Sequence, residues 1–289
     1  MSYSRNYKTF PVLPLILLVC SFCGATTLVF CVTPHGIIVA TDSMASNFSV
    51  GRAGKSVQPY QRVKKAIIVQ DRIVVATVNM TIMDFSHTGH PEDAIRYNFT
   101  QWMAEVDEQC PKNVSVSALT SLLEIKSRTT FENVNKAIAG GAFNQKKPSQ
   151  PFVEYFIAGY QSGIPTITHL YFNIDWDKNR LTDPIIGEIH PDHDPRVDFG
   201  FGVAGRADVI DQLRNRESDG YKEMLDLIPH ELPKVISEQD LSIREATNLC
   251  LAVLRYETRH NNSLVGAPYV IITIPPLGGG APSRVVYSK

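Results

Sequence analysis

Thr26 is the residue whose position in this sequence most directly suggests chemistry. It follows Ala25, with Cys23 two residues earlier, and a signal peptidase accepts small residues at those two positions. Cleavage after Ala25 would make Thr26 the first residue of the mature chain. An N-terminal threonine carries a hydroxyl nucleophile and an α-amine base on one residue. The spacing therefore predicts acyl-transfer chemistry that starts when the leader is removed.

The segment before Thr26 has the pattern of a leader and is open to three interpretations. Basic residues up to Lys8 precede an almost uninterrupted apolar stretch over 10–22. A cleaved signal peptide, an uncleaved membrane anchor and a propeptide all fit, because no charged side chain occurs between Lys8 and Asp42. Pro11 and Pro14 interrupt the apolar stretch and favour the cleaved signal.

Charge and cysteine content narrow the class of protein. The 28 basic and 29 acidic residues nearly cancel, and no cluster of Lys and Arg stands out, which argues against a nucleic-acid partner. Without the leader, Cys31, Cys110 and Cys250 remain, so at most one disulfide could form. We expect residues 1–25 to be a leader, 26–277 one domain, and the glycine-rich 278–289 a flexible tail.

Glycosylation motifs indicate the compartment better than the cysteines do. Five Asn-x-Ser/Thr sequons occur, at Asn47, Asn79, Asn98, Asn113 and Asn261. Together with the leader they favour a secreted protein or one of the secretory pathway.

The elements that must position Thr26 begin with two strand pairs. Leu28–Val32 and Ile37–Ala40 are apolar runs separated by Pro34 and Gly36, which predicts an antiparallel hairpin with Thr26 roughly opposite Asp42. A second pair is predicted over 63–69 and 73–78.

Further along the chain, apolar spacing predicts helices and additional strands. Helices are expected over 91–107, 115–126, 207–213 and 244–259, and strands over 152–158, 166–173 and 270–274. Strands and helices come in separate runs, which favours an α+β fold over alternating βαβ units.

Several of these motifs together resemble the β-type subunits of the proteasome and the HslV peptidase, which are N-terminal-nucleophile (Ntn) hydrolases. The similarity is carried by Thr26-Thr27, the turn at His35-Gly36, the run Val39-Ala40-Thr41-Asp42-Ser43, Val63-Lys64-Lys65 and Ala158-Gly159-Tyr160. It covers nearly the whole chain after the leader, with a short insertion between Asp42 and Lys65. The resemblance implies a four-layer αββα sandwich, in which two antiparallel sheets lie between helical layers.

The resemblance also implies roles for individual residues. Thr26 would be the nucleophile, and its α-amine would take the proton, since such amines have a pKa near 8. Lys65 would lie beside the hydroxyl and favour the alkoxide through its positive charge. Asp42 would hold Lys65 in position.

Other positions depart from the family pattern. The oxyanion-hole glycine is replaced by Met80, whose backbone N–H could still serve but whose side chain could obstruct a substrate. Ala204-Gly205 replaces a Ser-Gly pair, so that hydroxyl is absent. Ser263, which supports the amine, is retained, but His260 stands where a carboxylate is expected. These changes make a catalytically inactive scaffold or binding subunit the alternative to an active threonine peptidase.

The implied partners are a peptide or protein substrate and a ring of β-type subunits, with neither cofactor nor metal. The run His190-Pro-Asp-His193-Asp194 is interpreted as a solvated loop rather than a metal site. If the chain were a proteasome subunit, it would lie in the cytoplasm or nucleus, and residues 1–25 would be a propeptide.

Overall fold

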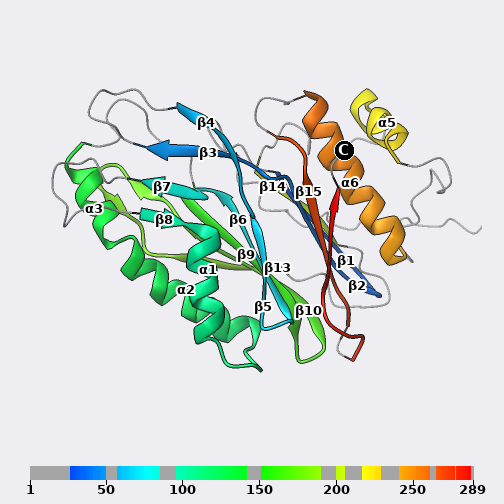
Figure 1. Ribbon diagram of the computed structural model, residues 1–289, viewed down its shortest axis with the longest axis horizontal. Helices are drawn as coiled ribbons and strands as arrows, with labels where there is room; N and C mark the ends of the chain where they lie inside the picture. Colours follow the sequence, from blue (N-terminus) through cyan, green and yellow to red (C-terminus); the bar gives the residue numbers. More distant parts are fainter. Residues whose placement is uncertain are drawn as a thin grey trace, which may run out of the picture.

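The computed structural model describes residues 27–49, 57–84, 96–141, 151–189, 200–205, 217–228, 241–260, 265–276 and 278–287. Within these ranges the chain forms an α+β sandwich of four layers, in which two antiparallel sheets lie between helices (Figure 1). This confirms the fold class predicted from the sequence.

The first sheet has five strands in the order β14-β1-β2-β15-β16. Their bounds are β1 Thr27–Thr33, β2 Gly36–Thr41, β14 Gly200–Gly205, β15 Tyr269–Ile274 and β16 Ser283–Tyr287. The helices α5 (Asp219–Asp226) and α6 (Ile243–His260) cover its outer face (Figure 1).

The second sheet has the order β13-β10-β9-β6-β5. Its strands are β5 Ala66–Val69, β6 Ile73–Asn79, β9 Val153–Gln161, β10 Ile164–Phe172 and β13 Ile185–Ile189. Three helices cover its outer face, namely α1 Phe99–Gln109, α2 Val116–Thr130 and α3 Glu132–Ala139 (Figure 1).

Alternation along the strands produces three apolar layers, because successive side chains point to opposite faces. In β1, Leu28 and Phe30 face the second sheet, whereas Val29 and Cys31 face α6. A third cluster fills the space between the second sheet and α1–α3.

The hairpin predicted at the start of the chain is confirmed, but its register differs by one residue. Thr33 pairs with Gly36 and Leu28 with Thr41. The same register brings Thr27, rather than Thr26, beside Asp42, whose backbone N–H donates to the Thr27 carbonyl at 3.3 Å. Gly36 has φ +154°, and a Cβ there would lie 2.8 Å from the Ile274 carbonyl oxygen, so the turn requires glycine.

The second predicted pair is also present, with a shorter first strand. Gln70 and Asp71 both have positive φ, and the Arg72 N–H donates to the Val69 carbonyl at 3.1 Å to close the turn. The strand over 63–69 was predicted too long: β5 begins at Ala66, and 63–65 connect it to β4 in another sheet.

That additional four-stranded sheet was not predicted. It has the order β4-β3-β7-β8, with bounds β3 Met44–Ser49, β4 Val57–Arg62, β7 Ile82–Asp84 and β8 Arg96–Asn98. The predicted insertion between Asp42 and Lys65 supplies two of its strands, which carry too few apolar residues to show a period of two.

Two helix predictions need correction and one lies outside the described ranges. In the described part of the helix expected over 91–107, 96–98 form β8 and the helix begins at Phe99, where the Asn98 side chain caps it by accepting from the N–H groups of Thr100 and Gln101; 91–95 lie outside the described ranges. The helices α3 and α5 were missed, α6 matches its prediction, and α2 continues to Thr130, beyond the predicted end at 126. Residues 207–213 are not among those described.

The tail predicted to be flexible contains a strand in its second half. Ser283–Tyr287 forms β16, which pairs with β15 from Tyr269↔Tyr287 to Thr273↔Ser283. Glycines at 278–280 allow the chain to turn back, after which a β-branched pair, Val285-Val286, continues the sheet.

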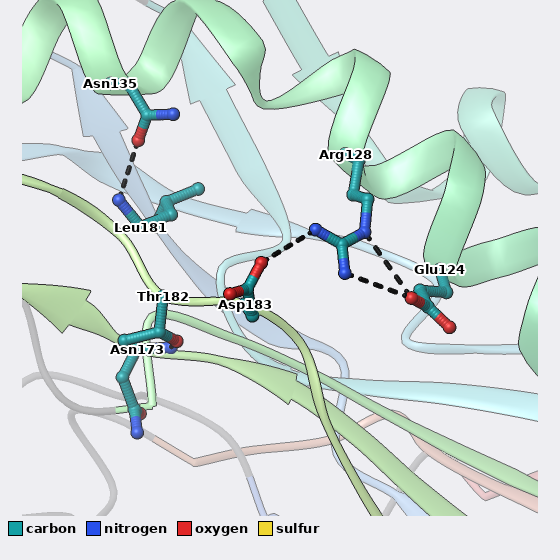
Figure 2. Close-up of polar contacts among 7 residues, drawn as sticks. All are labelled: Glu124, Arg128, Asn135, Asn173, Leu181, Thr182 and Asp183. Carbon is teal, nitrogen blue, oxygen red and sulfur yellow. Dashed lines mark hydrogen bonds and ion pairs between the residues drawn. The ribbon is translucent and has the colours of Figure 1, made fainter.

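Polar contacts connect α2 and α3 to the short hairpin of β11 (Ile174–Asp175) and β12 (Arg180–Leu181) (Figure 2). Asn135 accepts from the Leu181 N–H at 2.6 Å. Arg128 contacts Glu124 at 3.2 Å and Asp183 at 2.9 Å. Both Arg128 contacts are exposed, so they add little to stability.

Candidate active site

A buried ion pair connects the two sheets at the end of the sandwich where β1 begins. Asp42 follows β2, and Lys65 precedes β5; their Oδ1 and Nζ atoms are 2.8 Å apart. Both side chains are fully buried. Charged side chains are rarely buried without a partner, so this pair is a specific feature rather than a surface contact.

The same carboxylate oxygen also holds the beginning of β1. The backbone N–H of Thr27 donates to Asp42 Oδ1 at 3.0 Å. That nitrogen belongs to the peptide bond joining Thr26 to Thr27. Asp42 therefore fixes both an ammonium group and the peptide bond adjacent to Thr26, although Thr26 itself is outside the described part of the chain.

Backbone contacts keep the ion pair in place. Thr77 donates its N–H to the Lys65 carbonyl at 2.8 Å, and Ser43 donates to the Gly266 carbonyl at 3.4 Å. The hydroxyls of Thr27 and Ser43 are buried here and have no hydrogen-bond partner among the described residues. The surroundings of the ion pair are thus buried, and they nevertheless contain hydroxyl groups.

Burial lowers the pKa of Lys65 below its ordinary value of 10.5, because removal from water penalises the charged ammonium. The charge of Asp42 and its hydrogen bond act in the opposite direction and favour the ammonium. The net result is a lysine that loses its proton more readily than one in water.

Met80 follows β6 at the same end of the second sheet. Its side chain is 6% exposed and packs in the apolar layer under α1–α3. The preceding residue, Asn79, has a left-handed φ of +69°. The methionine side chain is thus enclosed in the core.

His260 ends α6 and contacts α5. Its Nε2 lies 3.0 Å from Glu223 Oε2, and its ring lies 4.5 Å from that of Tyr256. About half of the His260 side chain is exposed. Ser263 lies outside the described ranges, so the pairing of these two residues around an amine stays a prediction.

The replacement of the Ser-Gly pair falls in β14. Ala204 pairs with Leu28, and Gly205 pairs with Thr27. This strand is therefore the neighbour of β1 at the candidate site, and it brings no hydroxyl at 204.

Sequence reasoning missed a second buried polar cluster, which adjoins Met80. Asn79 donates from Nδ2 to Glu154 Oε1 and to the Pro151 carbonyl, and Glu154 Oε2 lies 2.9 Å from His169 Nε2. A glutamate near the start of the apolar strand 153–158 was the available signal. The Asn79 amide is buried and already hydrogen-bonded, so the sequon at 79 is not open to a glycan. The position of Asn79 beside the predicted site suggested the same.

No metal-binding group emerges from the ranges that the structure describes. These ranges contain no cluster of three or more His, Cys, Asp or Glu side chains suited to a metal ion, and the run 190–194 is not among them. Cys31, Cys110 and Cys250 are buried and free. No described helix is both long and apolar enough to cross a bilayer.

A cavity of about 530 Å³ lies at the opposite end of the sandwich. It is bordered by Arg72, Tyr160 and Pro275, near the turn between β1 and β2. Its position follows from the register, since Ile274 pairs with Ile37 whereas Val270 pairs with Thr41, next to Asp42. The cavity is therefore separate from the ion pair.

The four-layer arrangement is shared with solved structures of Anbu proteins. The helically assembled Anbu complex from Pseudomonas aeruginosa matches with a TM-score of 0.53 and 14% identity, over 91% of this chain and 87% of that chain. Anbu from Yersinia bercovieri, described as an ancestral beta-subunit, matches with a TM-score of 0.50 and 16% identity over the same shares. At such identities the likeness shows the fold alone.

No protein-family model matches the chain, and no curated protein matches it either. The assignment to proteasome β-type subunits and HslV is corrected by the structural matches, which are to Anbu proteins. The opening hairpin, Asp42 and Lys65 were read as marks of one family, but a fold alone does not identify a family.

Proposed function

We propose that this protein is a threonine-type amide hydrolase acting on peptides. Its nucleophile would be the Thr26 hydroxyl, exposed when the leader is removed after Ala25, and the Thr26 α-amine would accept the proton. The proposal needs neither a cofactor nor a metal.

The observation that supports it best is the double role of Asp42. One oxygen of this carboxylate binds the ammonium of Lys65 at 2.8 Å and the Thr27 N–H at 3.0 Å. The Thr27 nitrogen that Asp42 holds is bonded directly to the carbonyl carbon of Thr26. A structural strand end would need no buried ammonium beside it, whereas a hydroxyl nucleophile gains from one.

Lys65 would act by electrostatics. The protonated amine of Lys65 favours the alkoxide of a nearby hydroxyl. The buried surroundings strengthen this effect because they screen charge poorly. The lowered pKa of Lys65 additionally allows the amine to exchange a proton during the reaction. Met80 would supply a backbone N–H to the developing oxyanion.

A peptide epoxyketone tests this proposal, because the reagent reacts with a hydroxyl and an amine of one residue to close a ring. We expect the mature protein to be labelled at Thr26 and Thr26→Val to remain unlabelled. Thr129→Val, which removes a hydroxyl on the exposed side of α2, is the matched control and should label normally. Labelling of Thr26→Val at the wild-type rate would refute the proposal.

An inactive scaffold or binding subunit is the second candidate, and one observation favours it. His260 stands where the resemblance implied a carboxylate, and its Nε2 contacts Glu223 on α5. An amine that lacks its carboxylate partner would be a weaker base. A mature chain that begins at Thr26, is folded and does not react with the epoxyketone would favour this second function.

Self-association and a secretory route complete the proposal. The Pseudomonas aeruginosa Anbu complex is described as a helical assembly, and we infer that this chain also associates with copies of itself. Sedimentation velocity of the mature protein should give a mass above that of one chain.

For the secretory route, treatment with an endoglycosidase should lower the mass of material from a eukaryotic host, with Asn113 a candidate acceptor on the exposed surface.

A further inference from the structure

Asn79, the residue before Met80, is held by a buried network of hydrogen bonds. Asn79 ends β6 with φ +69°, a conformation that asparagine adopts more readily than most residues. Its Nδ2 donates to the Pro151 carbonyl at 2.9 Å and to Glu154 Oε1 at 2.5 Å. Both amide hydrogens are thus engaged, which fixes the orientation of the side chain.

Glu154 is in turn fixed by His169. Its second oxygen lies 2.9 Å from His169 Nε2, and Glu154 is only 3% exposed. The His169 ring stacks between Phe156 and Tyr171, with centroid separations of 4.3 and 4.6 Å. The imidazole therefore has little freedom to rotate, and it holds the carboxylate in one place.

We propose that Glu154, oriented by His169, is a positioning residue for the oxyanion-binding N–H of Met80. Glu154 holds the Asn79 side chain, and thereby fixes the left-handed backbone at 79 that sets the direction of the next peptide N–H. This inference rests on the proposed function, because it gives the network a role only if Met80 serves an oxyanion.

A purely structural role explains the network less well. The strands β6 and β9 already pair over six residues, from Val74↔Ala158 to Asn79↔Val153. Thr77 adds a hydroxyl bond to the Glu154 carbonyl at 3.0 Å. The strands are thus joined without the Glu154 carboxylate, whose burial is costly. Among the residues that the structure describes, this carboxylate bonds to Asn79 and His169, at the end of the sheet that adjoins Met80.

The test compares substitutions that keep or remove the hydrogen bonds. Glu154→Gln can still accept from Asn79 and contact His169, whereas Glu154→Leu can do neither. At position 79, glycine tolerates positive φ but alanine does not. We therefore expect Glu154→Gln and Asn79→Gly to be less impaired than Glu154→Leu and Asn79→Ala, respectively.

The readout is the rate of labelling by a peptide epoxyketone at several reagent concentrations. Attack of the threonine hydroxyl on the ketone forms a C–O bond, passes the hydroxyl proton to the α-amine and moves the carbonyl π pair onto oxygen, so the rate depends on the oxyanion donor. A misplaced donor should lower the maximal rate on the order of 100-fold, with half-saturation within about 2-fold of wild type. Glu124→Leu, which removes an exposed carboxylate bound by Arg128 (Figure 2), is the control and should react like wild type.

Periodate separates a failure of this inference from a failure of the proposed function. It cleaves the bond between the amine-bearing and hydroxyl-bearing carbons of an N-terminal threonine and needs no oxyanion donor. If periodate or the epoxyketone fails on the wild-type protein, the proposed function is wrong. Suppose that both reagents react with the wild-type protein. If Glu154→Leu and Asn79→Ala are then labelled by the epoxyketone at the wild-type rate, the positioning role is wrong. The two sites test it independently, so one variant that does not fold leaves the other decisive.

Discussion

Replacing Lys65 by methionine should destabilise the protein more than any surface substitution. Methionine has a similar length and no charge, so the change removes the ammonium while filling most of its space. Asp42 would keep the Thr27 N–H but lose its bond of 2.8 Å to Nζ. A buried carboxylate without its cationic partner is the condition in which a broken ion pair is most costly.

The expected loss follows from the burial of both partners. Because Lys65 and Asp42 have no exposed side-chain surface, solvent screens the pair little, and the free energy of unfolding should fall by about 3–5 kcal/mol. A domain of this kind has about 5–15 kcal/mol in total. Lys65→Met should therefore remain folded but unfold at a clearly lower urea concentration.

Urea unfolding followed by tryptophan fluorescence measures this loss, since Trp102 is buried beneath α2 and loses its bond to Thr130 on unfolding. The double variant Asp42→Asn with Lys65→Met should be less damaged than the sum of the two single variants, with a coupling of about 1–3 kcal/mol. A loss below about 1 kcal/mol for Lys65→Met, or strict additivity, would refute the assignment of a tightly coupled buried pair.

The remaining predictions concern pH, a buried hydroxyl pair and the surface. Folding lowers the pKa of Lys65, so the unfolded chain binds more protons than the folded one between the folded pKa and 10.5. The free energy of unfolding should therefore rise with pH in that window. Lys65→Met should lack this rise when the two proteins are compared by urea titration. Tyr155→Phe removes a buried hydroxyl 3.0 Å from that of Tyr97 and should cost about 1–3 kcal/mol in the same assay. Asp183→Asn, at a side chain 86% exposed, should change stability by less than about 0.5 kcal/mol; a larger change would show that the Arg128 contact is not screened.

Local patterns predicted the parts of the fold that depend on local physics. The hairpin of β1 and β2 needed only two apolar runs and a turn that requires Gly36. The helix α6 followed from its apolar spacing, which matches the side buried against the first sheet. In both cases the signal and the cause lie within one stretch of sequence.

Features that depend on distant segments could not be predicted. The sheet of β3, β4, β7 and β8 joins residues from 44 to 98, and its strands lack a regular apolar pattern. The tail forms β16 only because β15 offers an edge. Asp42 was expected roughly opposite Thr26, and the observed register places it beside Thr27, one residue away.

The candidate site was predicted in part for the same reason. Asp42 and Lys65 were expected to meet, and their side chains do so across the two sheets. Glu154 and His169 were not considered, because a glutamate inside an apolar strand gives no indication of its partner until the strands pair. Thr26 and Ser263 stay predictions.

The most direct test of the central claim is the identity of the first residue of the mature protein. N-terminal sequencing of the purified mature chain, supported by its intact mass, should give Thr26 with a free α-amine. Such a terminus would provide the nucleophile and the base beside the peptide bond that Asp42 holds. A chain that begins anywhere else, or whose Thr26 amine is still part of a peptide bond, would contradict the account.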